Sequence, residues 1–337
     1  MTMRVQFGGQ TYELLPGETL LAGLERQGVS VPAFCRTGVC QTCVLKAKRG
    51  RPPARSQVGL EERWVEQGCF LSCQCVPEEP LEVELSDAVG HFESRVARVE
   101  ALSPEVLRVE LDVPEGLVYR AGQYLQLERA GGVARPYSLA SIPGSAHLEL
   151  HVRRIPGGVM SEWLTSAVGE PVTLRGPFGE SFYFEQEPTR PLLLAGTGTG
   201  LAPLLGVVRA ALAAGHRAPI HLYHGCSSVD RLYFVDELSK LAASSPTLRV
   251  VCSVLSGEGA SASSSASSGS PAPPRCAVLA QPLDRLILDD PLDFADCRIY
   301  LCGNPDVVAR LRQRVYLSGA PRSRIHCDPF VAPAAKP

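Results

Sequence analysis

The stretch Leu193-Leu-Ala-Gly-Thr-Gly-Thr-Gly-Leu-Ala-Pro203 decides the fold of the C-terminal part of this chain. It passes from an apolar run through alternating glycines into a segment with a helical pattern at residues 203–214. Glycines allow a backbone to approach a pyrophosphate closely, and the N-terminus of a helix favours its negative charge. A glycine run alone is often only a tight turn, but the flanking strand and helix favour a nucleotide-binding turn.

Strands and helices continue to alternate around this stretch. Further strands are expected at residues 220–223, 248–254 and 298–301, and helices at residues 234–243 and 305–317. This alternation predicts a doubly wound parallel α/β domain over residues 188–337. Residues 256–274 are almost all Ser, Ala, Gly and Pro and cannot bury enough surface to order themselves, so we expect a flexible insertion there.

Two further regions precede this domain, because 337 residues are more than one hydrophobic core usually supports. Residues 91–187 hold short strands between Pro and Gly turns, which is typical of an antiparallel β-barrel. These strands are expected at residues 96–99, 106–111, 124–127, 147–152 and 172–174. Residues 1–88 show a hairpin, a helix at 18–27 and a closing strand at 81–85. The predicted fold class is α+β with three domains.

The composition excludes several classes of function. A net charge of −2 predicts neither nucleic-acid nor membrane affinity, and no apolar run approaches the roughly 20 residues of a membrane helix. The first residues lack the apolar core of a secretory signal, so we expect a cytoplasmic location. Twelve cysteines in that compartment favour metal ligation over disulfides, because the cytoplasm keeps thiols reduced.

The cysteine spacing is Cys35-x4-Cys40-x2-Cys43, followed by twenty-nine residues and Cys73. In plant-type 2Fe–2S proteins this spacing lets one tight loop supply three thiolates and a distant segment the fourth. A zinc site is the alternative, but structural zinc prefers two matched CxxC pairs. Which cysteine is the fourth ligand is left open by the spacing, because Cys69 and Cys75 lie close to Cys73 in the sequence.

The segment Leu71-Ser-Cys-Gln-Cys-Val-Pro77 resembles plant-type ferredoxins, in which the cysteine after Leu-Ser or Leu-Thr is the ligand. The resemblance implies a β-grasp domain with Cys73 as the fourth ligand and Cys75 as a bystander. Gly38 and the small polar residues of the loop offer backbone N–H groups that can point at the sulfurs.

Arg135-Pro-Tyr-Ser138 lies in the strand-rich middle region. An arginine offers a fork of donors to a phosphate, a tyrosine an aromatic face, and a serine a hydroxyl. A four-residue string alone could be a strand end, but this one resembles the RxYS motif of the ferredoxin–NADP reductase superfamily. The resemblance implies that Arg135 contacts the flavin phosphate, Tyr137 the isoalloxazine ring and Ser138 the region of its N5 atom.

A second segment, Arg153 to Leu164, follows in the same region. Gly157-Gly158, with Ser161 at the head of a helix, offers the close backbone approach and free N–H groups that a phosphate needs. The superfamily holds the flavin pyrophosphate here, which implies FAD as the flavin. The residues implied are Gly158, Val159, Met160 and Ser161.

The stretch 193–203 is similar to the GTGTGxAP motif of the same superfamily, in which Thr199 faces the nicotinamide. The other implied cofactor contacts there are Gly196, Gly198 and Gly200. Tyr300-Leu-Cys-Gly-Asn-Pro305 resembles the CGxP motif, which implies that Cys302 and Ser138 flank the position of hydride transfer and that Gly303 contacts the cofactor. A buried cysteine without a role is the alternative for Cys302.

The segment Ile325-His-Cys-Asp-Pro-Phe330 resembles the terminal acidic-x-aromatic segment, which implies that Phe330 covers the flavin. A reader of the nucleotide 2′-phosphate is expected after the second strand, at residues 226–231. Arg231 is the one basic residue there, and it can equally be a solvated charge at a helix start. We therefore favour NADH over NADPH.

The order of the three motifs makes chemical sense, because nicotinamide gives two electrons, an iron–sulfur cluster accepts one, and a flavin exchanges either number. The whole chain resembles the reductase components of bacterial multicomponent oxygenases with an N-terminal ferredoxin domain, such as that of toluene monooxygenase. The resemblance implies an oxygenase or hydroxylase component, or its ferredoxin, as electron acceptor. A reductase for a non-oxygenase acceptor and a non-enzymatic redox sensor are the alternatives.

Charge is uneven in the first domain. Residues 46–55 hold five basic residues and no acid, whereas residues 61–87 hold eight acids against Arg63. Either these are two solvated faces, or the basic loop docks an acidic partner near the cluster.

Overall fold

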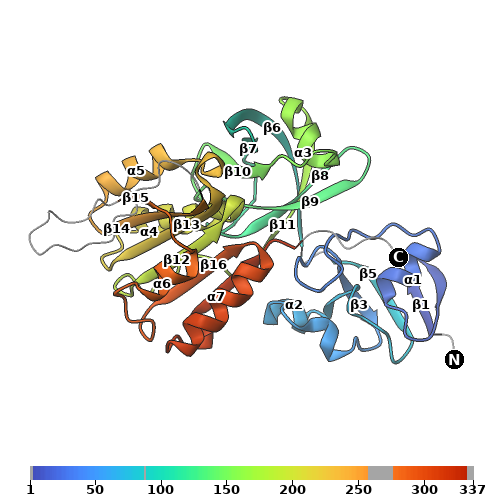
Figure 1. Ribbon diagram of the computed structural model, residues 1–337. Coiled ribbons are helices and arrows are strands. Elements are labelled where there is room, and N and C mark those ends of the chain that lie inside the picture. Colours follow the sequence, from blue (N-terminus) through green and yellow to red (C-terminus); the bar gives the residue numbers. More distant parts are fainter. Residues whose placement is uncertain (1–2, 87–88, 257–275, 332–337) are drawn as a thin grey trace, which may run out of the picture.

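The computed structural model describes residues 3–86, 89–256 and 276–331. Three sheets follow one another along the chain, coloured from blue through green to red in Figure 1. No helix among the described residues is long and apolar enough to cross a membrane. The expected insertion at residues 256–274 lies outside the described residues from position 257 onward.

The first sheet has five strands in the order β2-β1-β5-β3-β4, with β1 and β5 parallel and the other pairs antiparallel. They are β1 (Met3–Phe7), β2 (Gln10–Leu14), β3 (Val44–Arg49), β4 (Cys69–Leu71) and β5 (Leu81–Leu85). Helix α1 (Leu20–Arg26) buries its leucines against the sheet, and the Thr19 hydroxyl caps it by accepting from the Ala22 N–H at 3.3 Å. A 3-10 helix, η1 (Ala54–Gln57), and helix α2 (Glu62–Glu66) connect β3 to β4. The expected hairpin, helix and closing strand are confirmed.

The second sheet is antiparallel, in the order β10-β7-β6-β11-β8-β9. Its strands are β6 (Gly90–Ser103), β7 (Val106–Asp112), β8 (Tyr124–Arg129), β9 (Val133–Ser138), β10 (His147–Arg153) and β11 (Pro171–Phe178). Leu139, directly after β9, bridges to Leu150 of β10, so the two edges approach and the sheet curls into a half-barrel. Helices α3 (Val159–Trp163) and η2 (Leu164–Ser166) contribute Met160 and Leu164 to its core.

The third sheet is parallel throughout, in the order β15-β14-β13-β12-β16-β17. Its strands are β12 (Leu192–Thr197), β13 (Ile220–Ser228), β14 (Leu248–Ser256), β15 (Cys276–Leu279), β16 (Arg298–Gly303) and β17 (Ile325–Pro329). Its helices are α4 (Leu201–Ala213), α5 (Val235–Ser244), α6 (Leu283–Leu288) and α7 (Pro305–Leu317). The doubly wound α/β prediction is confirmed, although the short elements β15, α6 and β17 were not expected.

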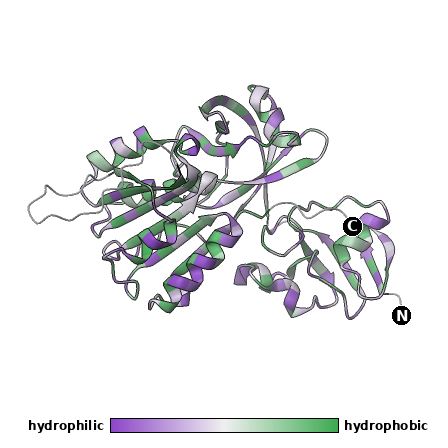
Figure 2. Ribbon diagram, viewed as in Figure 1, coloured by the Kyte–Doolittle hydropathy of each residue, from purple (hydrophilic) through white to green (hydrophobic). Residues whose placement is uncertain are grey.

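The helices of the third sheet pack on its two faces and form two separate cores. One core joins α4 and α5 to the sheet, and the other joins α6 and α7. Figure 2 shows hydrophobic strands inside and hydrophilic residues along the outer side of α7. Helix α7 turns Val308, Leu311 and Val315 inward, and Asn304 caps its N-terminus by accepting from the Asp306 and Val307 N–H groups.

Candidate cofactor site

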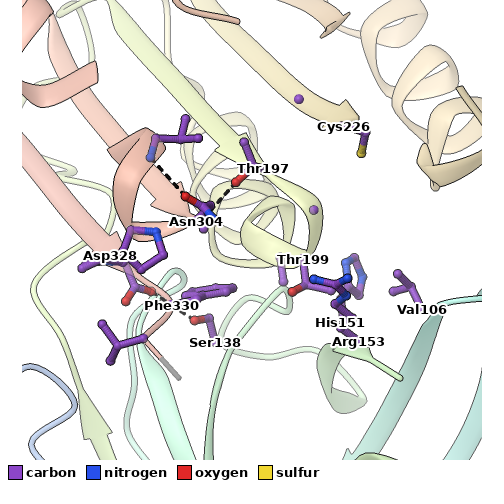
Figure 3. A pocket seen from close by; sticks show the side chains of 18 of the residues that line it. Val106, Ser138, His151, Arg153, Thr197, Thr199, Cys226, Asn304, Asp328 and Phe330 are labelled. Atoms are coloured by element: carbon purple, nitrogen blue, oxygen red, sulfur yellow. Dashed lines mark hydrogen bonds between the residues drawn. The ribbon is translucent and has the colours of Figure 1, made fainter. Parts of the chain in front are cut away.

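A cavity of about 960 Å³ lies where the three sheets meet. Its walls come from the cysteine loop at residues 34–40, from β8, β9, β10 and α3, and from the carboxyl ends of β12, β13, β16 and β17. In open α/β sheets, ligands bind outside the carboxyl ends of the strands. Figure 3 shows Thr199, Ser138 and Phe330, which come from different elements, around the same space.

Arg135, Tyr137 and Ser138 all line this cavity from β9. The Arg135 guanidinium lies 5.1 Å from the centre of the Phe34 ring and donates to the Ala134 carbonyl at 2.7 Å. Burial raises the pKa of the Tyr137 phenol, so its hydroxyl stays protonated. A single strand therefore presents a cation, an aromatic face and a hydroxyl, which is the set of groups that a flavin and its phosphates can use.

Ser138 meets an acidic partner that is distant in the sequence. Its hydroxyl donates to Asp328 Oδ2 at 3.1 Å, although the two residues are 190 positions apart. Burial raises the pKa of Asp328 to about 6, and the Ser138 hydrogen bond lowers it. The sequence analysis did not identify Asp328 as a site residue. The feature that could have identified it is its acidic position in the acidic-x-aromatic segment.

Phe330 lies in the cavity beside this pair (Figure 3). Its N–H donates to the Gly303 carbonyl at 2.7 Å, which anchors the end of β17 to the end of β16. Gly303 itself has a φ of 109°, and a Cβ there would lie 2.5 Å from the Thr197 carbonyl oxygen. Glycine is therefore required for this turn to close against β12.

The turn before α3 differs from the expectation at one position. Gly158, Val159, Met160 and Ser161 all line the cavity, as the motif implied. Helix α3 begins at Val159, however, so Ser161 lies inside the helix and not at its head. The Ser161 hydroxyl accepts from the Ile155 N–H at 3.1 Å and donates to the Gly158 carbonyl at 3.3 Å. It closes the turn, so the Ser161 hydroxyl is engaged by the backbone of residues 155 and 158.

The glycines at the end of β12 and in the turn after it have two different roles. Gly198 and Thr199 line the cavity, whereas Gly196 and Gly200 do not. A Cβ on Gly196 would lie 2.7 Å from a side chain of α4, and one on Gly200 would lie 2.7 Å from the Cys302 carbonyl oxygen. Gly198 has a φ of 54° with open space around it. Two glycines therefore allow the strands and helix to pack, and one opens the backbone toward the cavity.

Cys302 lies at the end of β16 but behind the cavity wall. Its side chain is 2% exposed and is not among the groups that line the cavity. Burial raises the pKa of the thiol well above its usual value, so it is protonated at neutral pH. The backbone that reaches the cavity belongs to the next residues, Gly303 and Asn304. A part for the Cys302 thiol in the reaction stays a prediction.

The four cysteines of the motif come from the loop at residues 35–43 and from the segment after β4. Their thiols associate in two pairs, Cys35 with Cys40 and Cys43 with Cys73. The backbone N–H groups of Thr37 and Cys40 donate to Cys35 Sγ at 3.4 and 3.3 Å. Backbone donors aimed at a sulfur stabilise its thiolate form and tune a bound metal centre.

The hydrogen bond within each thiol pair lowers the pKa of one thiol and raises that of its partner, so the pKa values of Cys40 and Cys43 are raised. The hydrogen bonds from their partner thiols lower the pKa of Cys35 to about 4 and that of Cys73 to about 7. Within the described ranges, no three Cys, His, Asp or Glu side chains converge as they would around one metal ion. Zinc requires four donors around one point, whereas two thiol pairs suit the two irons of a 2Fe–2S cluster. Cys75 is fully buried and burial raises its pKa to about 12; its expected role as a bystander stays a prediction.

The cysteine loop is held in an unusual backbone conformation. Arg36 and Gln41 have φ values of 58° and 53°, which are uncommon for residues other than glycine. Two hydrogen bonds, at 2.6 and 2.7 Å, join the Arg36 guanidinium to the Glu25 carboxylate, and Gln41 Nε2 donates to the Gly59 carbonyl at 2.6 Å. Such strain persists when its surroundings enforce it, and it is common at functional sites.

Known proteins match the chain in the order of its sheets. Three family models cover it: a 2Fe–2S iron–sulfur cluster binding domain at residues 4–78, an oxidoreductase FAD-binding domain at 93–183 and an oxidoreductase NAD-binding domain at 194–313. The reductase component of the naphthalene 1,2-dioxygenase system of Pseudomonas putida is 30% identical, over 98% of each chain. The chain belongs to this family of oxygenase reductase components.

Two further relatives agree with this assignment. The reductase is 36% identical to the reductase subunit of an aromatic O-demethylase from Amycolatopsis, over 74% of its own chain and 80% of that protein. The crystal structure of the Amycolatopsis cytochrome P450 reductase GcoB superimposes with a TM-score of 0.65 at 30% identity, over 98% of this chain and 99% of that one. The reductase therefore carries a 2Fe–2S cluster and FAD and takes NAD(P)H as its substrate. The predicted three-domain fold, enzyme class and cofactors are confirmed, and the roles of individual residues stay predictions.

Proposed function

We propose that the reductase oxidises NADH and delivers single electrons from its 2Fe–2S cluster to an oxygenase component, or to the ferredoxin of that component, in the cytoplasm. The observation that carries this proposal is one cavity with walls from all three sheets, including Cys40, Ser138 and Thr199. Nicotinamide supplies two electrons, FAD exchanges one or two, and the cluster accepts one. The chain itself positions these groups and excludes water from them.

Each wall of the cavity has a proposed task. Arg135 contacts the FAD phosphates, Tyr137 and Ser138 contact its ring system, and the backbone of residues 158–161 holds its pyrophosphate. Gly198 receives the nucleotide pyrophosphate at the start of α4, and Thr199 faces the nicotinamide. Phe330 covers the flavin from the side of β17.

Two thiol pairs hold the cluster in this proposal. Cys35 and Cys40 ligate one iron, and Cys43 and Cys73 ligate the other. The contacts between the thiols of each pair and the lowered pKa of one thiol in each support this assignment. Cys40 also lines the cofactor cavity, so the cluster and the flavin are neighbours.

The preference for NADH rests on the segment after β13. Arg231, its one basic residue, has its Nη2 atom 3.1 Å from Glu105 Oε1, so the arginine is already paired with a carboxylate. A 2′-phosphate requires basic partners that are free to bind it.

Two observations concern the acceptor and the location. Lys48 Nζ lies 3.6 Å and Arg49 Nε 3.5 Å from the Glu82 carboxylate, so the basic loop is partly neutralised within its own sheet. This disfavours the hypothesis that the loop docks an acidic partner. Within the described residues, none of the twelve cysteines forms a disulfide, which supports a reducing compartment.

The test is an anaerobic absorbance experiment on the purified holoenzyme. We expect flavin and 2Fe–2S absorbance to bleach together within seconds of adding NADH, followed by reoxidation when an oxygenase component is added. Bleaching of the flavin alone would show that the cysteine site takes no electrons, and the proposal would then fail. Fast turnover with ferricyanide as acceptor would argue against a redox sensor that only binds its cofactors.

A further inference from the structure

A pair of opposite charges from two different sheets lies at one end of the cavity. Glu105 sits in the turn between β6 and β7 of the flavin-binding sheet, and Arg231 ends the 3-10 helix η4 (Val229–Arg231) directly after β13 of the nucleotide-binding sheet. Arg231 Nη2 and Glu105 Oε1 are 3.1 Å apart, and both residues line the cavity. Their side chains are 46% and 43% exposed, so a ligand can reach both.

The position of this pair identifies the part of the nucleotide that it faces. β13 lies parallel to β12, the strand that carries the glycine turn. In dinucleotide-binding sheets, the end of this second strand faces the ribose of the adenosine, where a carboxylate binds the 2′-hydroxyl or an arginine accommodates a 2′-phosphate. In this chain the arginine follows the second strand, and the carboxylate beside it comes from another sheet.

The local charges favour a neutral ribose. Asp230 adds a second carboxylate next to Arg231, so the three side chains sum to one negative charge. All three charges act on the thiol of Cys226, which also lines the cavity: burial is the main reason that its pKa rises to about 11, Arg231 lowers it, and Glu105 and Asp230 raise it. A 2′-phosphate would bring further negative charge to this place, whereas a 2′-hydroxyl can donate a hydrogen bond to a carboxylate.

We propose that Glu105 selects NADH over NADPH by occupying Arg231 and by presenting a carboxylate to the 2′ position of the nucleotide. This inference rests on the proposed NADH-oxidising function and assigns its specificity to a residue outside the nucleotide-binding sheet. The choice of nucleotide is then made where two sheets meet, and not by the segment after β13 alone.

The test compares kcat/KM for NADH and NADPH in the intact holoenzyme, with ferricyanide as acceptor. Glu105→Gln frees Arg231, so we expect the NADPH:NADH ratio of kcat/KM to rise about tenfold, an effect that one charge-assisted hydrogen bond can give. The matched control is Glu115→Gln, which removes an exposed carboxylate from the turn after β7 that does not line the cavity. Flavin and cluster absorbance confirm that each variant is folded and loaded.

A double variant isolates the arginine. Glu105→Gln/Arg231→Gln should lose the gain in NADPH use, because the phosphate then has no free cation at this position. The inference is overturned if Glu105→Gln changes the ratio no more than Glu115→Gln does, or if the double variant keeps the gain. Failure of the proposed function has a different signature, since the wild-type reductase would then turn over neither nucleotide.

Discussion

The flavin-binding sheet meets its two neighbours in different ways. Toward the cysteine-containing sheet the junction is filled with rings: Trp64 lies edge-on to Phe178 at 5.8 Å between ring centres, and Phe178 stacks on Tyr124 at 5.5 Å. All three side chains are buried. Toward the nucleotide-binding sheet rings also pack, as His151 does against Tyr233 with 5.4 Å between ring centres. This second junction nevertheless leaves a cavity of about 960 Å³, which the cysteine loop also lines, and we call it the hollow junction.

The difference follows from what has to cross each junction. A nucleotide must enter and leave, so that side needs open space, glycine backbone and polar groups. Electrons need a short and constant separation between two bound groups, which close-packed side chains maintain because protein interiors deform little. Tyr124 belongs to both junctions, since it stacks on Phe178, lines the cavity and pairs across the sheet with Ser138.

The largest effect is expected from removing a cluster ligand. Cys73→Ser should abolish 2Fe–2S binding, because an alcohol does not replace a thiolate ligand of iron. FAD content and NADH-dependent reduction of ferricyanide should persist, because the hollow junction is untouched. Iron content and the visible spectrum measure the first effect, and steady-state turnover measures the second.

Cys75→Ser is the control for this variant. Cys75 lies only two residues after Cys73, and its thiol is fully buried. It should keep the cluster, even if the buried hydroxyl lowers stability. Loss of iron in Cys75→Ser with retention in Cys73→Ser would reverse the assignment of the fourth ligand.

Phe178→Ala should weaken the filled junction. Deleting a buried phenyl ring costs about 3–5 kcal/mol, and here it also removes the ring contacts of Phe178 with Trp64 and with Tyr124. We expect a lower midpoint of unfolding in urea and slower reduction of the cluster in stopped-flow absorbance, with NADH reducing the flavin at the wild-type rate. Phe178→Leu, which keeps most of the volume, should lie between the two. Equal slowing of both steps would mean that the ring supports the whole fold and not this junction.

Much of this architecture could be predicted from the sequence, because the elements carry local patterns. Periodicity located the long strands and α7, and cysteine spacing and glycine turns located the cofactor regions. The contacts between sheets carry no such pattern. The Ser138–Asp328 hydrogen bond and the Trp64–Phe178 contact join residues that are distant in the chain and become neighbours only through packing. The orientation of Ser161 was missed because a one-turn helix such as α3 has no periodicity that fixes its first residue.

Two glycine substitutions test the separate roles of packing and cofactor binding in the hollow junction. Gly200→Ala places a Cβ 2.7 Å from the Cys302 carbonyl oxygen and should destabilise the protein by about 1–3 kcal/mol, as overpacking does. Gly198→Ala meets open space, so its cost is the strain of a positive φ, about 1–2 kcal/mol. Thermal unfolding measures both. The KM for NADH should rise mainly in Gly198→Ala, because Gly198 lines the cavity; a larger rise in Gly200→Ala would contradict the separation of roles.

The smallest expected effect concerns the hydrogen bond between Ser138 and Asp328, which joins two walls of the cavity. Asp328 has a pKa raised by burial to about 6, so its carboxyl group is mostly ionised at pH 7.5 and mostly neutral at pH 5. The Ser138 oxygen faces the cavity as an acceptor only while its hydrogen is donated to Asp328. We therefore expect the rate of flavin reduction by NADH to fall a few-fold as the pH falls through about 6.

Asp328→Asn should flatten that profile, because the amide oxygen accepts from Ser138 at every pH. Stability depends on pH in the opposite direction from the rate: the rate falls as the pH falls, whereas stability falls as the pH rises. The folded state binds the Asp328 proton more tightly than the unfolded state, whose pKa is about 3.9, so wild-type stability falls as the pH rises from about 4 to 6. The variant should not show this loss, whereas Asp112→Asn, at an exposed carboxylate, should behave like the wild type. A wild-type rate that is constant between pH 5 and 7.5 would show that the hollow junction does not depend on this bond.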